Sequence, residues 1–316
     1  MSKIAFIFPG QGAQYVGMGK DFYENVPVCR QVMDLAGEAS GLDMKQICFE
    51  ENEKINITEY TQIAMLSVSV AILKALEEKG ITSCVNAGLS LGEYGALVAS
   101  GVISMEDAFK LVRKRGIYMQ EAVPTGGAMS AVLGTDAAVI EKICEQTEGI
   151  VSIANYNCPG QIVITGEEGA VARAAEALKE AGARRVMPLK VSGPFHSAML
   201  KGAGEKLGGE LAHVTIQKFT TPYVTNVTAE YVTEPDEVKD LLIRQVSSPV
   251  KWQQCVEKMI ENGVDTFIEI GPGKTLTGFM KKINRNVTAM NIQTLEDLNQ
   301  VVDRFKAEEK VEENRC

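Results

Sequence analysis

The chain has 316 residues, a length that at roughly 100–200 residues per domain predicts one large domain or two smaller ones. Hydrophobic residues make up 45% of it and charged residues 23%, which is typical of a soluble globular protein. The 41 acidic and 32 basic residues give a net charge of −9. This balance argues against nucleic acid as the main partner, because binding to its phosphates needs clustered Lys and Arg.

The seven cysteines are predicted to be reduced. Their number is odd and no two of them form a Cys-x-x-Cys pair, so the spacing indicates neither a disulfide framework nor a metal site. A reduced protein without a signal peptide is expected in the cytoplasm. The apolar stretch at residues 63–76 is interrupted by Lys74 and followed by charged residues. It predicts a buried central helix rather than a membrane span.

In the first part of the chain, strands and helices are predicted to alternate. The last of these helices begins at Ser104, which can cap it, and Asp107 follows three residues later. The predicted elements are a strand at 4–8, helices at 21–38 and 60–79, a strand at 85–89, and helices at 92–99 and 104–119.

The pattern changes between two joints rich in Gly and Pro, at residues 124–127 and 192–194. The order of elements between them is βαββαβ, the ferredoxin-like pattern, and it predicts an inserted small domain at 125–195. Its predicted elements are a strand at 128–133, a helix at 136–148, strands at 151–155 and 161–165, a helix at 168–181 and a strand at 184–190.

After the second joint the alternation resumes. Together with residues 1–124, residues 196–316 are predicted to form an α/β domain with a mostly parallel sheet covered by helices. The predicted elements here are helices at 197–211, 235–246 and 249–262, a strand at 266–270, a helix at 275–283, a strand at 287–291 and a helix at 294–308.

The sharpest local motif is Gly88-Leu89-Ser90-Leu91-Gly92, which matches G-x-S-x-G. It follows an apolar strand and opens a helix, the context of a nucleophile elbow. The new helix directs its free N–H groups at developing negative charge. The alternative is that a Gly-Ser-Gly string is only a turn between a strand and a helix, but the surrounding pattern favours a nucleophilic serine.

A nucleophilic serine needs a base, and histidine is the usual one. The chain has two histidines, His196 and His213. His196 follows Gly193-Pro-Phe in a rigid loop after the small domain, whereas His213 lies at the end of a helical pattern. Because catalytic residues are commonly placed on such loops, the sequence favours His196.

Two glycine-rich turns resemble nucleotide-binding motifs only in part. After the first strand, Gly10 and Gly12 fit G-x-G-x-x-G, but Tyr15 stands where the third glycine belongs. This favours a loop that supplies one backbone N–H group to an oxyanion hole. The turn that ends at Lys274 lacks the first glycine of a P-loop, since Ile268 occupies that position. We interpret it as a turn between a strand and a helix.

Taken together, the motifs of the chain resemble those of the malonyl-CoA:acyl-carrier-protein transacylases, acyltransferases of fatty acid and polyketide synthesis. The resemblance covers nearly the whole chain and implies an α/β-hydrolase-like core with an inserted ferredoxin-like small domain. It rests on seven ordered motifs, which are Phe8-Pro-Gly-Gln-Gly-Ala-Gln14, Gly88-Leu-Ser-Leu-Gly-Glu-Tyr94, Arg113-Lys-Arg-Gly116, Asn155-Tyr-Asn-Cys-Pro-Gly-Gln161, Gly193-Pro-Phe-His-Ser197, Ser248-Pro-Val-Lys-Trp252 and Glu269-Ile-Gly-Pro-Gly-Lys274.

The resemblance implies catalytic roles at matching positions. Ser90 would be the acylated nucleophile and His196 its base. Gln245 would orient His196 through a backbone carbonyl group, in place of the acid of a Ser-His-Asp triad. Gln11 and Leu91 would supply the two N–H groups of the oxyanion hole.

Substrate-binding roles follow in the same way. Arg115 would bind the malonyl carboxylate, since a guanidinium meets a carboxylate with two parallel hydrogen bonds. Phe195 would pack beside the malonyl α-carbon, and Asn157 and Gln161 would also contact substrate. One position departs from the family, because Leu89 stands where a histidine commonly precedes the nucleophile.

The implied reaction is transfer of a malonyl group from malonyl-CoA to the pantetheine thiol of acyl carrier protein through a malonyl-serine intermediate. We expect a cytoplasmic monomer that needs no cofactor or membrane. Both substrates are anionic, so basic residues are expected near the site, and the candidates are Arg184, Arg185, Lys190 and Lys274.

Other readings remain open on the sequence. A serine hydrolase such as a thioesterase would share the elbow and the histidine, although Arg115 and the small domain favour transfer. A dinucleotide-binding module is disfavoured by Tyr15. Within the family, a polyketide pathway or a malonate decarboxylase could use the same malonyl loader.

Overall fold

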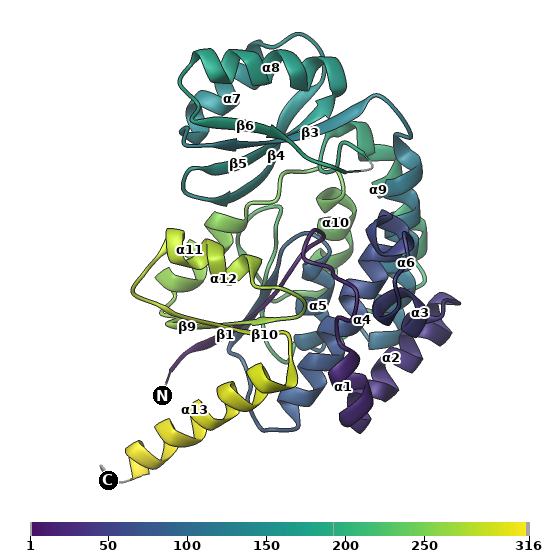
Figure 1. Ribbon diagram of the computed structural model, residues 1–316, viewed down its shortest axis with the longest axis vertical. Coiled ribbons are helices and arrows are strands. Elements are labelled where there is room, and N and C mark those ends of the chain that lie inside the picture. The colour runs from purple at the N-terminus through teal and green to yellow at the C-terminus, as the bar shows by residue number, and fades with distance from the viewer. Residues whose placement is uncertain (1, 192, 314–316) are drawn as a thin grey trace.

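The computed structural model describes residues 2–191 and 193–313, and it contains two sheets (Figure 1). The first sheet has the strand order β10-β9-β1-β2-β7-β8, in which only β7 and β8 are antiparallel. The predicted mostly parallel sheet is therefore confirmed. Its strands are β1 (Ile4–Phe8), β2 (Val85–Gly88), β7 (Tyr223–Val224), β8 (Tyr231–Val232), β9 (Thr266–Ile270) and β10 (Thr288–Ile292).

The second sheet is antiparallel, with the order β4-β5-β3-β6. Helices α7 (Ala137–Gln146) and α8 (Glu168–Glu180) cover the face that is turned away from the first sheet (Figure 1). The βαββαβ order matches the predicted one, although Ser192 of the second joint lies outside the described residues. The strands are β3 (Gly127–Leu133), β4 (Val151–Cys158), β5 (Gln161–Glu167) and β6 (Arg185–Pro188).

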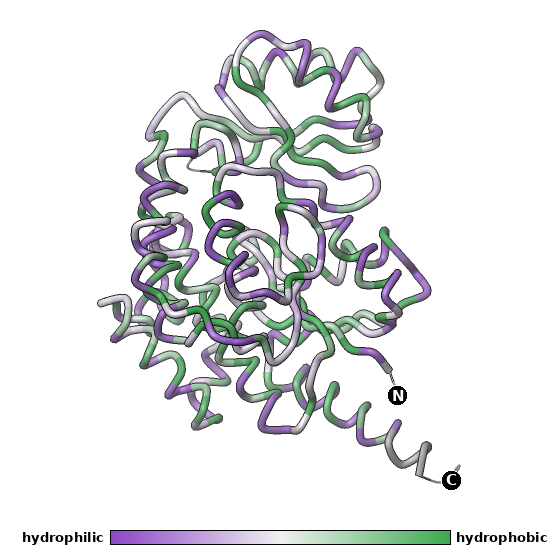
Figure 2. The backbone as a smooth tube through the Cα atoms, turned by 180° about the vertical axis from the view of Figure 1, so that it is seen from behind, coloured by the Kyte–Doolittle hydropathy of each residue, from purple (hydrophilic) through white to green (hydrophobic). Residues whose placement is uncertain are grey.

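The remaining helices surround the first sheet (Figure 1). Along the chain (Figure 2), the helices of this part alternate between hydrophobic and hydrophilic segments, as expected for helices with one buried face. They are α1 (Lys20–Asn25), α2 (Pro27–Ser40), α3 (Met44–Phe49), α4 (Thr58–Glu77), α5 (Gly92–Ala99), α6 (Met105–Ala122), α9 (Lys201–Leu211), α10 (Pro235–Gln245), α11 (Trp252–Glu261), α12 (Thr275–Ile283) and α13 (Leu295–Glu313).

Two sequence predictions need correction. The single helix expected at 21–38 is two helices, because Pro27 disfavours helical backbone at Val26, which is extended with φ −120° and ψ 110°. Helix α3 and the strands β7 and β8 were not predicted. A strand of two residues is too short to show an alternating pattern, and β7 proves important for the site.

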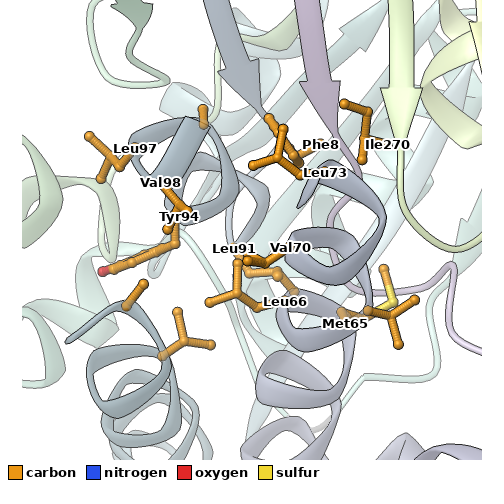
Figure 3. Packing of buried hydrophobic residues seen from close by; sticks show 14 of the residues in the cluster. Phe8, Met65, Leu66, Val70, Leu73, Leu91, Tyr94, Leu97, Val98 and Ile270 are labelled. Atoms are coloured by element: carbon orange, nitrogen blue, oxygen red, sulfur yellow. The ribbon is translucent and has the colours of Figure 1, made fainter. Parts of the chain in front are cut away.

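Helix α4 forms the centre of the core beside the first sheet. Among the described residues it alone is long and apolar enough to cross a membrane, but 83% of its apolar window is buried inside the protein. The predicted buried central helix is thus confirmed. Leu66 and Val70 of α4 pack in one cluster with Phe8 of β1 and with Leu91 and Tyr94 beside the elbow (Figure 3). The elbow therefore packs against buried apolar side chains of the core.

Candidate active site

Ser90 lies in the sharp turn between β2 and α5, with the left-handed φ of 54°. The flanking glycines are required by close backbone contacts. A Cβ atom on Gly88 would lie 2.0 Å from the carbonyl oxygen of Gly92, and one on Gly92 would lie 2.2 Å from the carbonyl oxygen of Phe8. The sequence motif thus forms a strained turn of the kind that exposes a nucleophile.

The structure brings Ser90, His196 and Gln245 together. The Ser90 Oγ lies 2.8 Å from His196 Nε2, and His196 Nδ1 lies 2.9 Å from the backbone oxygen of Gln245. A carbonyl oxygen only accepts hydrogen bonds, so Nδ1 carries the proton and Nε2 is free to accept the serine proton. His213 is exposed, follows the end of α9 and does not line the cavity.

Burial and the nearby Arg115 lower the pKa of His196 to about 4. The imidazole is therefore neutral at pH 7, which is the form that a general base needs. Its hydrogen bond to Gln245 opposes this shift but does not cancel it.

Arg115 extends from α6 to the same point and is 1% exposed. Its Nη2 lies 3.1 Å from Ser90 Oγ and 3.0 Å from Gln245 Oε1, and its Nη1 donates to Gln62 Oε1 at 2.7 Å. Within the described ranges no carboxylate forms an ion pair with Arg115, and its Nε has no hydrogen-bond partner. A permanent positive charge thus lies beside the serine, held only by neutral oxygens.

Gln11 and Leu91 line the cavity in front of Ser90. Within residues 2–191 and 193–313, neither backbone N–H group donates to a backbone acceptor. The side chain of Gln11 donates to Thr58 Oγ1 at 3.0 Å, which holds its loop against α4. Both residues thus have backbone N–H groups that are not used in backbone hydrogen bonds, which an oxyanion hole requires.

Asn226 and Glu93 were missed by the sequence analysis. Asn226 Oδ1 accepts the N–H group of Ser90 at 2.8 Å, and its Nδ2 donates to the Gly88 oxygen at 2.7 Å. Glu93 Oε2 accepts from Gln245 Nε2 at 2.7 Å and from the N–H group of Asn226 at 3.1 Å. The hydrogen bonds of these two residues thus hold the turn that carries Ser90 in place.

Asn226 could be predicted as a site residue only once β7 is known. This strand pairs with β2 and places Asn226 beyond the carboxyl end of a parallel strand. Gln62, the partner of Arg115, was also missed. It is 2% exposed near the start of α4, and an amide directly before the apolar residues 63–66 is the one clue that the sequence offered.

A cavity of about 820 Å³ opens above Ser90 between the two sheets. This volume lies in the range of small-molecule sites. The predicted substrate-contacting residues Phe195, Asn157 and Gln161 all line it, and Leu89 forms part of its wall. Among its described lining residues Lys190 is the one charged side chain, so no carboxylate opposes an anionic ligand.

The four predicted basic residues are not gathered at the cavity. Lys190 lines it, and the exposed Lys274 precedes the lining residue Thr275. Arg184 and Arg185 do not line the cavity, but Leu133 of β3 pairs with both Arg185 and the lining residue Gln161, so Arg185 lies two strands from the cavity wall. No group of three His, Cys, Asp or Glu residues within the described ranges is arranged to hold a metal ion.

Comparison with known proteins identifies the family. The model of the acyl transferase domain matches residues 5–306. The chain belongs to this acyl transferase family. It is 46% identical over 313 residues to the malonyl CoA-acyl carrier protein transacylase of Bacillus subtilis, covering 98% of this chain and 99% of that protein. It is 45% identical to the protein of the same name from Staphylococcus aureus, over 94% of this chain and 98% of the relative.

Solved structures agree with this assignment. The malonyl CoA-acyl carrier protein transacylase of Clostridium perfringens superposes with a TM-score of 0.95 at 48% identity, over 99% of this chain and 100% of that one. A second similar structure is a type II PKS acyl-carrier protein in complex with its malonyl-transacylase, with a TM-score of 0.93 at 40% identity over 96% and 100% of the two chains. The protein is therefore an acyltransferase.

Proposed function

We propose that this acyltransferase moves a malonyl group from malonyl-CoA to the pantetheine thiol of acyl carrier protein. One observation carries the proposal, namely that Ser90 Oγ lies 2.8 Å from the neutral base His196 and 3.1 Å from the buried guanidinium of Arg115. A nucleophile beside a permanent cation suits an acyl group that ends in a carboxylate. The names of the relatives and the structure of one with an acyl-carrier protein support the same substrates.

In the first half-reaction, Ser90 Oγ attacks the thioester carbonyl carbon while its proton passes to His196 Nε2. The oxyanion of the tetrahedral intermediate accepts from the N–H groups of Gln11 and Leu91, and one such donor lowers the barrier by about 3–4 kcal/mol. Collapse breaks the C–S bond, and the thiolate of CoA takes the proton from His196. A malonyl ester of Ser90 remains.

In the second half-reaction, the pantetheine thiol gives its proton to His196 and attacks the ester carbonyl carbon. The same two N–H groups stabilise the second oxyanion. Its collapse breaks the C–O bond to Ser90, whose oxygen regains the proton from His196. Because both halves use one serine in turn, the kinetics are ping-pong.

Selection of the malonyl group is assigned to Arg115. Its Nη1 donates to Gln62 Oε1, and Gln62 lines the cavity, so a malonyl carboxylate that replaces this amide oxygen would gain a charge-assisted hydrogen bond from Nη1. Phe195 packs beside His196 and would limit the bulk at the α-carbon. Asn157 and Gln161 lie on the small-domain wall and would contact the rest of the substrate.

The wider context is proposed on the same basis. Residues 1–124 and 196–316 form an α/β-hydrolase-like catalytic domain, and residues 125–195 form a ferredoxin-like small domain. The enzyme supplies fatty acid synthesis, acts as a cytoplasmic monomer, and needs no cofactor beyond its two substrates.

The test is the intact mass of the protein after it is mixed with malonyl-CoA. One malonyl adduct should appear, peptide mapping should place it on Ser90, and addition of acyl carrier protein with its pantetheine arm should remove it with formation of malonyl-carrier protein. Release of free malonate at the rate of transfer would instead assign the protein to the serine hydrolases. No adduct at all would contradict the proposed mechanism.

A further inference from the structure

We propose that Glu93 is a positioning residue of the transfer reaction, whose carboxylate acts through Gln245 and Asn226 on the Ser90–His196 pair. The negative charge of Glu93 stabilises the positive charge that forms on His196 when it accepts the serine proton. This inference rests on the proposed malonyl transfer, but its test below can fail while malonyl transfer stands.

The position of Glu93 supports this role. It lies in the first turn of α5, three residues after Ser90, and is 0% exposed. Its Oε2 accepts from Gln245 Nε2 at 2.7 Å and from the N–H group of Asn226 at 3.1 Å. The side chain of Thr225 also hydrogen-bonds to the Glu93 carboxyl group. Burial of this carboxyl group costs stability, and the two groups that donate to its Oε2, Gln245 and Asn226, both also contact Ser90.

Gln245 connects this carboxyl group to the reacting atoms. Its Nε2 donates to Glu93 and, at 2.9 Å, to the backbone oxygen of Ser90, while its Oε1 accepts from Arg115 Nη2. A flipped amide would place oxygen against the carboxylate and N–H groups against the guanidinium, and both contacts would be repulsive. Glu93 and Arg115 therefore fix the orientation of the residue whose backbone oxygen holds His196.

The charge balance of the site explains why a carboxylate is useful here. When His196 accepts the serine proton it becomes positive beside the positive Arg115, in a buried environment where like charges are costly. In a Ser-His-Asp triad an acid contacts the histidine directly. Here a backbone carbonyl takes that place, and Glu93 supplies the charge one residue further away, through Gln245. Charges separated by one side chain still interact here, because Glu93, Gln245 and His196 are all buried.

Within this cluster, Glu93 is the group expected to change charge near neutral pH. Burial raises its pKa to about 7. Burial and Arg115 hold the pKa of His196 at about 4, and the guanidinium of Arg115 keeps its charge throughout. Burial also raises the pKa values of the other groups whose charge interacts with Glu93, well above the neutral range, and these groups are Tyr94, Tyr223 and Cys255.

The test measures single-turnover formation of malonyl-Ser90 from malonyl-CoA between pH 5.5 and 8.5, for the wild type and Glu93→Gln. Above its pKa of about 7, Glu93 is ionised and favours the charged His196, so the wild-type rate should rise as the pH increases through 7. Glu93→Gln corresponds to the protonated form at every pH. It should be slower by about tenfold at pH 8.5 and equal to the wild type at pH 5.5, a scale typical of coupling within one hydrogen-bond network.

Two further variants separate charge from structure. Glu93→Asp keeps the charge on a shorter side chain, so it should be slower throughout but still accelerate as the pH rises through neutrality. Glu269→Gln is the matched control, because Glu269 is equally buried but accepts from Leu276 and Thr277 at the start of α12, outside the network. It should keep the wild-type shape of the pH profile.

A wild-type rate that does not change between pH 6 and 8 would overturn the proposal without any variant. An equal loss of rate in Glu93→Gln at every pH would also overturn the proposal, because it would leave Glu93 a purely structural role. In either case, a malonyl adduct on wild-type Ser90 would leave the proposed function intact.

Discussion

The two ends of the cavity are built in opposite ways. At the inner end, Ser90 and Glu93 of the elbow meet three side chains from other segments, and hydrogen bonds of 2.7–3.1 Å join the five residues. The three side chains are those of Arg115, His196 and Gln245, and each is buried. At the mouth, Leu189 and Val191 are each 37% exposed and flank the exposed Lys190. The reaction geometry is thus fixed by hydrogen bonds between buried side chains, whereas the residues at the mouth are exposed to solvent and available for contact with a partner.

The largest effect is expected from Ser90→Ala, at the centre of the inner end. The variant should fold with the thermal stability of the wild type, because the Oγ lies at the surface of the cavity. It should form no malonyl adduct, since among the described residues Ser90 is the one nucleophile that hydrogen-bonds to His196. Intact mass spectrometry checks this, and an adduct formed at the wild-type rate would place the chemistry elsewhere.

His196→Ala is expected to be nearly as severe, with acylation slowed by several orders of magnitude, about the loss seen when one member of a catalytic triad is removed. His213→Ala is the matched control, because His213 is exposed at the end of α9, and its rate should stay close to that of the wild type. Equal losses in the two variants would contradict the assignment of the base.

Arg115→Lys tests whether the buried cation selects the acyl group. Lysine keeps the charge but lacks the planar fork, so the preference for malonyl-CoA over acetyl-CoA should fall by about one to two orders of magnitude. Arg113→Lys is the control, since Arg113 pairs with Glu59 away from Ser90 and should leave the preference unchanged. The ratio of kcat/KM for the two thioesters is the measurement.

Phe195→Ala should widen the space beside His196. The ratio of kcat/KM for methylmalonyl-CoA to that for malonyl-CoA should rise by about 10–200-fold. This is the usual discrimination that an apolar pocket achieves against one methyl group. Competition between the two thioesters, read by mass spectrometry of the adduct, measures this. A wild type that already accepts both equally would show that Phe195 does not exclude the methyl group.

The smallest effect is expected at the mouth. Lys190→Glu combined with Lys274→Glu should lower kcat/KM for carrier protein by severalfold and weaken its dependence on salt, because charges at the rim act mainly on the rate of association. Acylation by a small malonyl thioester without phosphates should change little. An unaltered salt profile would mean that the carrier docks on another surface.

Much of the inner end could be predicted because its signals are local. The elbow around Ser90 depends on glycines adjacent in the chain, and with two histidines available the loop setting selected His196. The parallel sheet followed from buried strands that alternate with helices. Such features depend on backbone conformation and on hydrophobic periodicity, and both are visible over a few neighbouring residues.

The tertiary structure alone decided which distant side chains meet. Asn226 reaches Ser90 because the two-residue strand β7 pairs with β2, and Gln62 meets Arg115 because α4 packs against α6. For the same reason, Arg184 and Arg185 could not be placed by counting along the chain, since their distance from the cavity depends on how β6 pairs with β3. A local pattern determines a turn or a helix, but the partners of a buried polar group depend on contacts between segments that are far apart in sequence.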